Sequence, residues 1–501
     1  MYRSVEDFCR AAKQRADQGD VAGALEMIAE FVLGVISRQT SHAEVFSSPQ
    51  LDLLCLELGR QSPVAAPAAR DPELIVFLVT ALARTGGHSR VVADLRAADP
   101  AAKAVVLVTN TFHELRPRHL LGLPALGSAS AEIAPAGNLA MRLEWLKTRL
   151  ASLRPVRTYI LQHHFDPLCI AAAQPELSGQ LIYYHNCDHS LALGVHAPHA
   201  LHVDFNAKSF YRCREQEGLA DNAFWPLTVS VDRHRLDRPF MSRGYLTTAT
   251  SGGMEKFDGS HFIESVAYNV SYADIVPLVL RTTRGMHIHI GALPKSMLQG
   301  IAAGLSRAGV PRNRFVHLPY VRNLAAALVS HRVDAYLGSF PLGGGRATVE
   351  AMGAGLPLLV HSNYRTVFFS DTNEVYPGAL VWRHPDELAD HLKAITPETL
   401  QRHAALARAH FDAHHRPERL SAALKATLDG TAPEAPARPV HHPDALQYFL
   451  DKRSAIDPDY LGGFPSLSGE YGYGGRTEKI VRRVVRVLAR VYRVFAGPRG
   501  T

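Results

Sequence analysis

Short apolar runs alternate with amphipathic segments along most of this 501-residue chain. Apolar runs of four to eight residues are typical of buried strands, and apolar residues at every third or fourth position are typical of surface helices. The runs predict strands at 74–79, 104–108, 158–162 and 180–184, and then at 245–250, 287–290, 314–317, 335–337 and 358–360. Because helical patterns separate these strands, we predict two α/β units with parallel sheets.

The two ends of the chain depart from this alternation. Helical spacing at 24–35 and 51–58 precedes a linker rich in proline and alanine at 63–72, and a second proline-rich connector covers 430–443. We therefore expect five parts. They are a helical extension (1–70), a first α/β domain (71–240), a second α/β domain (244–430), a connector with a helix (431–475) and a terminal helix (476–501).

The expected terminal helix is basic and amphipathic. It carries eight basic residues against one acid, which accounts for the whole formal net charge of +7. Apolar residues, most of them valines, line much of the helix and arginines fill its other side. This pattern is typical of helices that lie on anionic membranes or dock in a partner's groove. The alternative is a helix that packs on the body. Because no base-stacking aromatics are interleaved, we expect an anionic membrane surface as the partner of 476–499, and no nucleic acid.

Cysteine usage and the N-terminus indicate the compartment. The five cysteines are scattered, odd in number and without a Cys-x-x-Cys pair, which favours a reducing environment. The first residues are charged where a signal peptide needs an apolar run, and no run of 18 apolar residues predicts a spanning helix. We expect a cytoplasmic protein that the terminal helix can bring to the inner face of the membrane.

Residues 334–360 carry the most informative local pattern. A strand (335–337) leads into the glycines Gly343, Gly344 and Gly345, and a short helix that starts near Thr348 follows. Free amides and the dipole at a helix start attract anions, and Glu350 in the first turn could reach ribose hydroxyls beside a diphosphate. No Gly-Lys-Ser/Thr follows, so this is not a P-loop. An ordinary turn in another α/β sheet is the alternative.

This order of glycine turn, Glu-Ala-Met-x-x-Gly-x-Pro and apolar strand resembles the donor-nucleotide site of GT-B glycosyltransferases. The resemblance implies an α/β protein with two facing Rossmann-like domains, of which the second binds a nucleoside-diphosphate sugar. It also implies roles for single residues. Lys256 would face the diphosphate or else be a solvated lysine, and His317 and Tyr320 would cup the nucleobase or else pack. The other implied donor-binding residues are Gly343, Gly344, Gly345, Arg346, Thr348 and Glu350.

The donor half resembles in particular the protein O-GlcNAc transferases and their bacterial relatives. The helix start of that family carries His-Thr-Thr, and the matching positions here are Gly345, Arg346 and Ala347, so the phosphate contacts must differ. The family's acidic ribose residue falls on Glu350. Many retaining relatives have a second glutamate where this chain has Leu342, and its absence favours inversion.

The first half should supply the acceptor side and the general base. Gly86 and Gly87 let the backbone approach a ligand, and His88 follows them after the first strand. The run Asn186-Cys-Asp-His189 follows another strand and resembles a motif near the acceptor site of bacterial glycosyltransferases. We predict His88 or His189 as the base, with no preference between them, and Asp188 as the residue that orients a histidine. His163 and Asn186 would join the acceptor side.

The same segment also allows a metal interpretation. Its candidate ligands are His185, Cys187, His189, His196 and His199. Structural zinc sites usually show closely paired ligands, which this run lacks, so we expect neither a metal nor another cofactor.

Together these patterns predict a metal-independent, inverting glycosyltransferase. It would move a sugar from a nucleoside-diphosphate sugar, with UDP favoured, to a hydroxyl of a glycan, a lipid-linked glycan or a protein. The alternatives are an inactive GT-B-like scaffold that binds a membrane or partner, and a nucleotide-sugar epimerase of the same fold.

Overall fold

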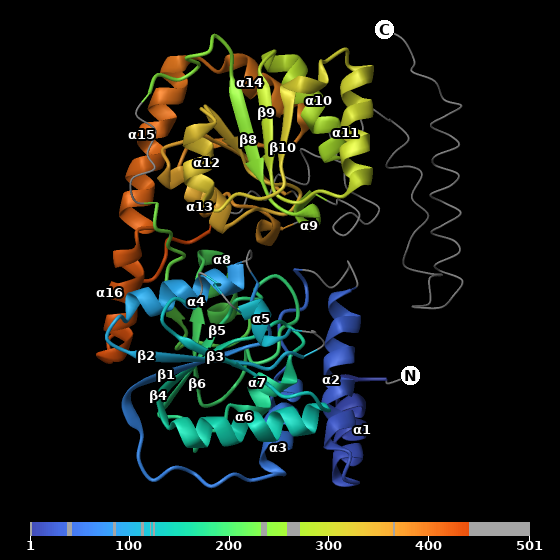
Figure 1. Cartoon of the computed structure of the whole chain (residues 1–501), viewed down its shortest axis with the longest axis vertical. Helices are drawn as coiled ribbons and strands as arrows, with labels where there is room; N and C mark the ends of the chain where they lie inside the picture. The colour runs from blue at the N-terminus through green and yellow to red at the C-terminus, as the bar shows by residue number, and fades with distance from the viewer. Residues whose placement is uncertain are drawn as a thin grey trace. The chain divides into compact units, whose positions relative to one another are not determined.

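Two parallel sheets, each covered by helices, form the body of the protein (Figure 1). The structure is a computed structural model that describes residues 3–37, 43–83, 87–111, 115–120, 122–123, 126–231, 238–257, 271–363 and 366–439. These all belong to one compact unit, 1–446. Gly86, the terminal helix expected at 476–501 and most of the connector lie outside the described residues. Within the described part, no helix has the length and apolar character needed to cross a membrane.

The first sheet has the strand order β3-β2-β1-β4-β5-β6-β7, with all neighbours parallel. Its strands are β1 (Asp71–Val79), β2 (Lys103–Val108), β3 (Ser130–Ile133), β4 (Pro155–Leu161), β5 (Gln180–Tyr184), β6 (Ala200–Asp204) and β7 (Ala223–Phe224). The predicted strand at 180–184 coincides with β5. The sequence analysis missed β3 and β6 because they mix polar with apolar residues, and β7 because it has only two residues, so none of the three leaves a continuous apolar run.

Alternate residues of β1 enter two different cores. Val76 and Leu78 pack with α1–α3, α6 and α7, whereas Ile75 and Phe77 pack with α4, α5 and α16 on the other face (Figure 1). Burial on both faces explains why the strands read as continuous apolar runs. The helices of this half are α1 (Val5–Asp17), α2 (Val21–Ile36), α3 (Pro49–Arg60), α4 (Gly87–Ala98), α5 (Pro117–Leu120), α6 (Leu139–Leu153), α7 (Pro167–Ala172), α8 (Ala207–Glu215) and α16 (Pro417–Leu428).

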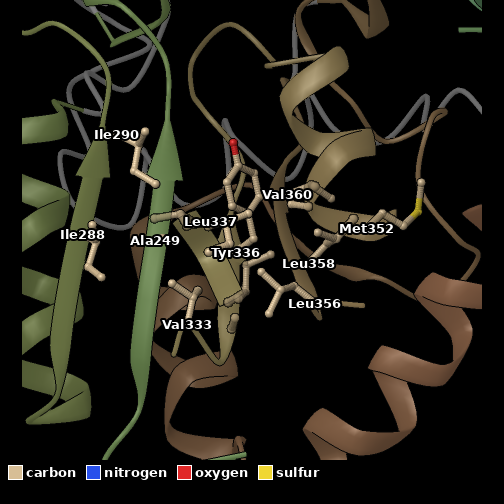
Figure 2. Packing of buried hydrophobic residues seen from close by; sticks show 14 of the residues in the cluster. Ala249, Ile288, Ile290, Val333, Tyr336, Leu337, Met352, Leu356, Leu358 and Val360 are labelled. Atoms are coloured by element: carbon tan, nitrogen blue, oxygen red, sulfur yellow. The ribbon is translucent and has the colours of Figure 1, made fainter. Parts of the chain in front are cut away.

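The second sheet has the order β10-β9-β8-β11-β12-β13, again all parallel. Its strands are β8 (Thr247–Ser251), β9 (Met286–Ile290), β10 (Phe315–Leu318), β11 (Ala335–Leu337), β12 (Leu358–His361) and β13 (Leu380–Trp382). Its helices are α9 (Met254–Phe257), α10 (Tyr272–Thr283), α11 (Lys295–Arg307), η3 (Arg312–Arg314), α12 (Leu324–Ser330), α13 (Arg346–Gly353), η4 (Val367–Phe369), α14 (Pro385–Ala394) and α15 (Pro397–His414). Figure 2 shows the core of this half, in which side chains of β8, β9, β11, β12 and α13 meet.

Two helical regions attach differently from the expected division of the chain. Helices α1–α3, expected as an extension, form part of the core beneath the first sheet. Helix α16 falls in the range expected for the second domain, yet Leu420 and Leu424 pack in the core of the first sheet. The indole of Trp225 also donates to the hydroxyl of Thr427 on α16, at 2.9 Å. The chain therefore returns to the first half after it completes the second.

Candidate functional site

Each sheet reverses its strand order at one place, between β1 and β4 in the first and between β8 and β11 in the second. Ligands of open α/β sheets bind outside the carboxyl ends of the strands at such a switch point. The predicted glycine turn follows β11, and His88 follows β1. Both predicted site segments therefore lie where the topology favours a ligand.

The glycine turn forms an anion-binding cradle at the start of α13. The amides of Gly344 and Gly345 donate to the carboxylate of Asp371, at 2.8 and 3.0 Å, and the hydroxyl of Thr348 donates to it at 2.5 Å. Gly345 has a φ of +51°, which favours glycine, and a Cβ on Gly343 would lie 2.2 Å from an oxygen of Asp371. The turn thus holds an anion, and that anion belongs to the chain itself.

Lys256 lies beside the same cradle. Its ammonium group donates to the carbonyl of Gly343 at 2.8 Å. Burial lowers the pKa of Lys256, and the nearby carboxylate of Asp371 opposes that shift. Lys256 also interacts electrostatically with Asp188 of the first half, so the predicted diphosphate cation and the predicted orienting carboxylate share one neighbourhood.

A lysine that the sequence analysis missed connects the two halves. Lys208 of α8 is buried, and its ammonium donates to the carbonyl of Ser370 at 2.7 Å and pairs with Glu374 at 3.0 Å. Burial alone would lower the pKa of Lys208, but the adjacent carboxylates, Glu374 first, raise it. No sequence pattern pointed to this pair, because α8 and residues 370–374 are more than 150 positions apart.

Arg346 does not face the cradle through a free guanidinium. It pairs with Asp94 of α4 and donates to the carbonyl of Thr228, at 3.3 Å. Burial raises the pKa of Asp94, while Arg346 counteracts the shift. Arg346 therefore ties the start of α13 to the first half, and its phosphate role stays a prediction.

The remaining predicted donor residues have mixed surroundings. One oxygen of Glu350 accepts from the amides of Leu324 and Ala325, at 3.1 and 3.2 Å, and so caps the start of α12. The Nε2 atom of His317 lies 2.8 Å from the carbonyl oxygen of Gly291. Tyr320 is 53% exposed. The structure brings Lys256, Gly343–Gly345 and Thr348 together, and gives Glu350 and His317 partners outside that group.

Asp188 and His189 lie beyond the carboxyl end of β5, an inner strand of the first sheet. The carboxylate of Asp188 accepts from Asn206 and from Ser209, at 2.5 and 2.8 Å, and lies 3.7 Å from Nδ1 of His189. Burial would raise the pKa of Asp188, but His189 and Lys208 reverse the shift and lower it. The side chain of His189 is 31% exposed. An anionic carboxylate therefore stands beside an accessible imidazole.

The rings of His88 and His163 lie close to each other. Their ring centroids are 4.7 Å apart, and Nε2 of His88 lies 3.9 Å from the sulfur of Cys187. Burial, with the neighbouring His163, lowers the pKa of His88 to about 3. His88 is thus a neutral imidazole at ordinary pH and a weak base.

Several buried polar atoms around these histidines lack a hydrogen-bond partner among the described residues. They are Nδ1 of His88, Oε1 of Gln162, Nε2 of His164 and Nδ2 of Asn186. Buried polar atoms in proteins are usually hydrogen-bonded to protein or to water, so these four are the positions at which a polar partner would be expected. Asn186 was predicted for the acceptor side, whereas Gln162 and His164 were not, since neither carries a recognisable motif.

Comparison with known proteins adds the fold. No protein-family model and no curated protein matches the chain. Among solved structures, Anabaena Alr3699/HepE in complex with UDP is 15% identical, covers 71% of this chain and 99% of its own, and has a TM-score of 0.54. A glycosyltransferase of Rickettsia africae is 8% identical, covers 72% and 97%, and also has a TM-score of 0.54. The chain has the GT-B fold.

This fold agrees with the sequence-based prediction of two Rossmann-like domains. An O-GlcNAc transferase of Thermobaculum terrenum also matches, at 14% identity over 88% of this chain and 85% of its own, but its TM-score of 0.48 is too low to support an argument. The specific resemblance of the donor half to that group stays a prediction. The structural similarity establishes the GT-B fold, but at identities this low it does not establish the activity, which has to be argued from the residues of the site.

Proposed function

We propose that this GT-B protein is a glycosyltransferase that uses a nucleoside-diphosphate sugar, with UDP favoured. The observation that carries the proposal is the cradle after β11, in which two glycine amides and the Thr348 hydroxyl already hold a carboxylate at the switch point. A diphosphate offers the same kind of acceptor oxygens. Alr3699/HepE, which shares the fold, was crystallised with UDP and with UDP and glucose.

The donor diphosphate would replace Asp371 in this cradle. As the bond between the sugar C1 and the diphosphate breaks, its electron pair moves to the diphosphate oxygen. The amides of Gly344 and Gly345 and the ammonium of Lys256 would then stabilise the growing negative charge. This arrangement supplies positive charge from the chain itself, which supports a reaction without a catalytic metal.

We assign the general base to His189. It is accessible and has the Asp188 carboxylate 3.7 Å from its Nδ1, whereas burial makes His88 a poor base with a pKa of about 3. The acceptor hydroxyl would give its proton to Nε2 of His189 while its oxygen attacks C1. Because Leu342 replaces the second glutamate of many retaining relatives, we propose a single displacement with inversion.

For the acceptor we propose a chemical class, and for the location a membrane surface. A glycan, a lipid-linked glycan or a protein hydroxyl fits the acceptor side, whose polar atoms lack partners among the described residues. The basic segment 476–499 supports a site of action at an anionic membrane surface in the cytoplasm.

Ligand-dependent stabilisation tests the donor site. We expect one class of nucleotide, among UDP, GDP, dTDP and their sugars, to raise the unfolding temperature of the wild type as RT ln(1 + [L]/Kd) requires. Lys256→Met should reduce that rise and should lower kcat more than it raises KM, because the charge on the diphosphate grows in the transition state. Lys393→Met, at an exposed lysine of α14, is the control. If no nucleotide stabilises the protein, the proposal fails.

Alanine variants test the base. His189→Ala should lower kcat by about 10²–10⁴ and keep the donor affinity, while His88→Ala should lower it much less. Circular dichroism checks folding. A larger loss in His88→Ala would reverse the assignment, and near-native turnover in both would move the base to another residue.

One observation favours an inactive scaffold as the second candidate. Asp371 fills the cradle, and Arg346 is paired with Asp94, so two expected phosphate contacts already have partners within the chain. A scaffold would bind no nucleotide sugar and would hydrolyse none. Turnover of any nucleotide sugar by the purified wild type therefore excludes it.

A further inference from the structure

Four buried side chains with metal-binding atoms meet beside the first sheet. His185 directly follows β5, His202 and Asp204 belong to β6, and Cys213 lies on α8. Their exposed fractions are 1%, 6%, 0% and 1%. One ligand atom from each lies within 4.8 Å of all the others. Of these residues, the sequence analysis considered only His185 as a ligand, because β6 and α8 bring the other three together from distant positions.

Three of the four short distances within the group match a four-coordinate site, and the fourth, between His185 and Asp204, is that of a hydrogen bond. Nδ1 of His185 lies 2.9 Å from Oδ1 of Asp204 and 3.4 Å from Sγ of Cys213. The same Oδ1 lies 3.3 Å from Nε2 of His202 and 3.5 Å from Sγ of Cys213. In a tetrahedral zinc site with bonds of about 2.0–2.3 Å, neighbouring ligand atoms are separated by about 3.3–3.7 Å.

The two ring nitrogens of His202 have different surroundings. Its Nδ1 lies 3.2 Å from the carbonyl oxygen of Val195, outside the group of four side chains. Its Nε2 is buried and lies 3.3 Å from Oδ1 of Asp204, inside that group. Nε2 is therefore the nitrogen that His202 would offer to a metal ion.

The surroundings of His202 and Asp204 resemble the supporting shell of a zinc site, whereas Nε2 of His185 is buried and has no hydrogen-bond partner among the described residues. Metal-binding histidines commonly donate their other N–H to a backbone carbonyl, as His202 does to Val195. The other oxygen of Asp204 accepts from the amide of Asn222, at 2.7 Å, which fixes the carboxylate. With four buried protein ligands no position stays open for substrate, so this geometry is that of a structural site.

We propose that His185, His202, Asp204 and Cys213 bind one structural zinc ion. The mixed nitrogen, sulfur and oxygen ligands suit zinc and exclude magnesium and calcium, which require oxygen. The ion would join β5, β6 and α8, the elements that present Asp188 and its partners Asn206 and Ser209. It replaces the expectation that the chain needs no metal, and it does not depend on the proposed enzymatic activity.

Metal analysis of the untagged full-length chain tests the site. After purification without chelators and dialysis, we expect about one zinc per wild-type chain by mass spectrometry. Cys213→Ser and His202→Asn should each fall below about one tenth of that value. Cys187→Ser, a buried cysteine two positions from His185, should keep the zinc. His410→Asn should also keep it; the rings of His410 and His414 on α15 lie 4.6 Å apart, and adventitious zinc could bind there.

Cobalt substitution keeps the test decisive if the ligand variants fail to fold. Wild-type protein refilled with Co²⁺ should show a thiolate-to-cobalt charge-transfer band and the visible bands of tetrahedral cobalt. Chelation should lower its unfolding temperature. If the wild type binds neither zinc nor cobalt, hydrogen bonds and ion pairs alone join the four side chains, and the proposal is overturned. Zinc that disappears in His410→Asn but stays in Cys213→Ser also overturns it.

Discussion

Each half of the protein has a buried carboxylate at its switch point, and the two are held in different ways. Asp166 accepts from the hydroxyls of Thr80, Thr109 and Thr111 and caps α7 through the amide of Leu168. Asp371 accepts from two glycine amides and the hydroxyl of Thr348. Both are almost fully buried, at 0% and 5% exposure.

The two carboxylates differ in whether their hydrogen-bond donors lie at a helix start, where a ligand anion would also bind. The threonines around Asp166 lie on the ends of β1 and β2 and serve no helix start, so Asp166 is a fixed part of the first domain. The donors around Asp371 are two amides at the start of α13 and the hydroxyl of Thr348, with Lys256 beside them. Helix starts attract anions, so in the proposed donor site a phosphate would take the place of Asp371. The comparison separates a structural carboxylate from a replaceable one.

Removing each carboxylate gives the largest expected contrast. Asp166→Ala leaves three buried hydroxyls without their acceptor and uncaps α7, so we expect the free energy of unfolding to fall by about 3–5 kcal/mol. Asp371→Ala should cost less, because two of its three donors, the amides of Gly344 and Gly345, are only half-buried and water can replace the lost acceptor, so that only the Thr348 hydroxyl is left buried. Urea unfolding at pH 7 measures both. Equal losses would contradict the distinction.

The next largest expected effect is the loss of stability at acidic pH, to which one buried histidine in each half contributes. Burial lowers the pKa of His287 in β9 to about 3, as it does for His88 in the first half. Above about pH 6.5 such a ring is neutral in both states. As the pH falls from there toward 3, only the unfolded chain binds the proton, so the free energy of unfolding falls.

His287→Gln should flatten this dependence by about 1.4 kcal/mol per pH unit between pH 6 and 4. Urea unfolding at several pH values measures the slope, and His88→Gln should flatten it similarly. An unchanged slope in His287→Gln would show that the ring is charged in the folded protein.

Asp371→Asn probes the replaceable carboxylate directly. It removes a negative charge from the cradle and keeps the side-chain shape, so we expect nucleoside diphosphate to bind about tenfold more tightly, equivalent to about 1.4 kcal/mol. Calorimetry with the matched nucleotide checks this, with Asp390→Asn at an exposed site as control. Weaker binding would mean that Asp371 helps to form the donor site.

The smallest effect separates the two roles of Glu350. Glu350→Ala should lower the free energy of unfolding by about 1 kcal/mol because the amides at the start of α12 lose their acceptor, and Glu350→Gln should keep most of it. If Glu350 also contacts the donor ribose, the alanine variant should weaken nucleotide binding by about 1–3 kcal/mol. Unchanged donor affinity would leave only the capping role.

Much of the fold could be predicted because buried parallel strands leave a local record. The runs at 180–184 and 335–337 coincide with β5 and β11, and the glycine turn could be placed after β11. Strands without such a run, β6 among them, were missed. The partners of the site residues were also missed, because Lys208, Asp371 and Glu374 carry no motif and meet only through the fold.

The sequence by itself determined the two α/β units and the glycine turn after β11, because these depend on local patterns of apolar residues and glycines. The expectation that Lys256 lies beside the turn came from the family resemblance, since the two are 87 positions apart. Only the tertiary structure decided that Asp371 fills the turn, that Arg346 joins the halves and that His185, His202, Asp204 and Cys213 converge. The physical reason is that each of these contacts joins residues far apart in the chain. Their positions are fixed by sheet order and helix packing, which no local pattern encodes.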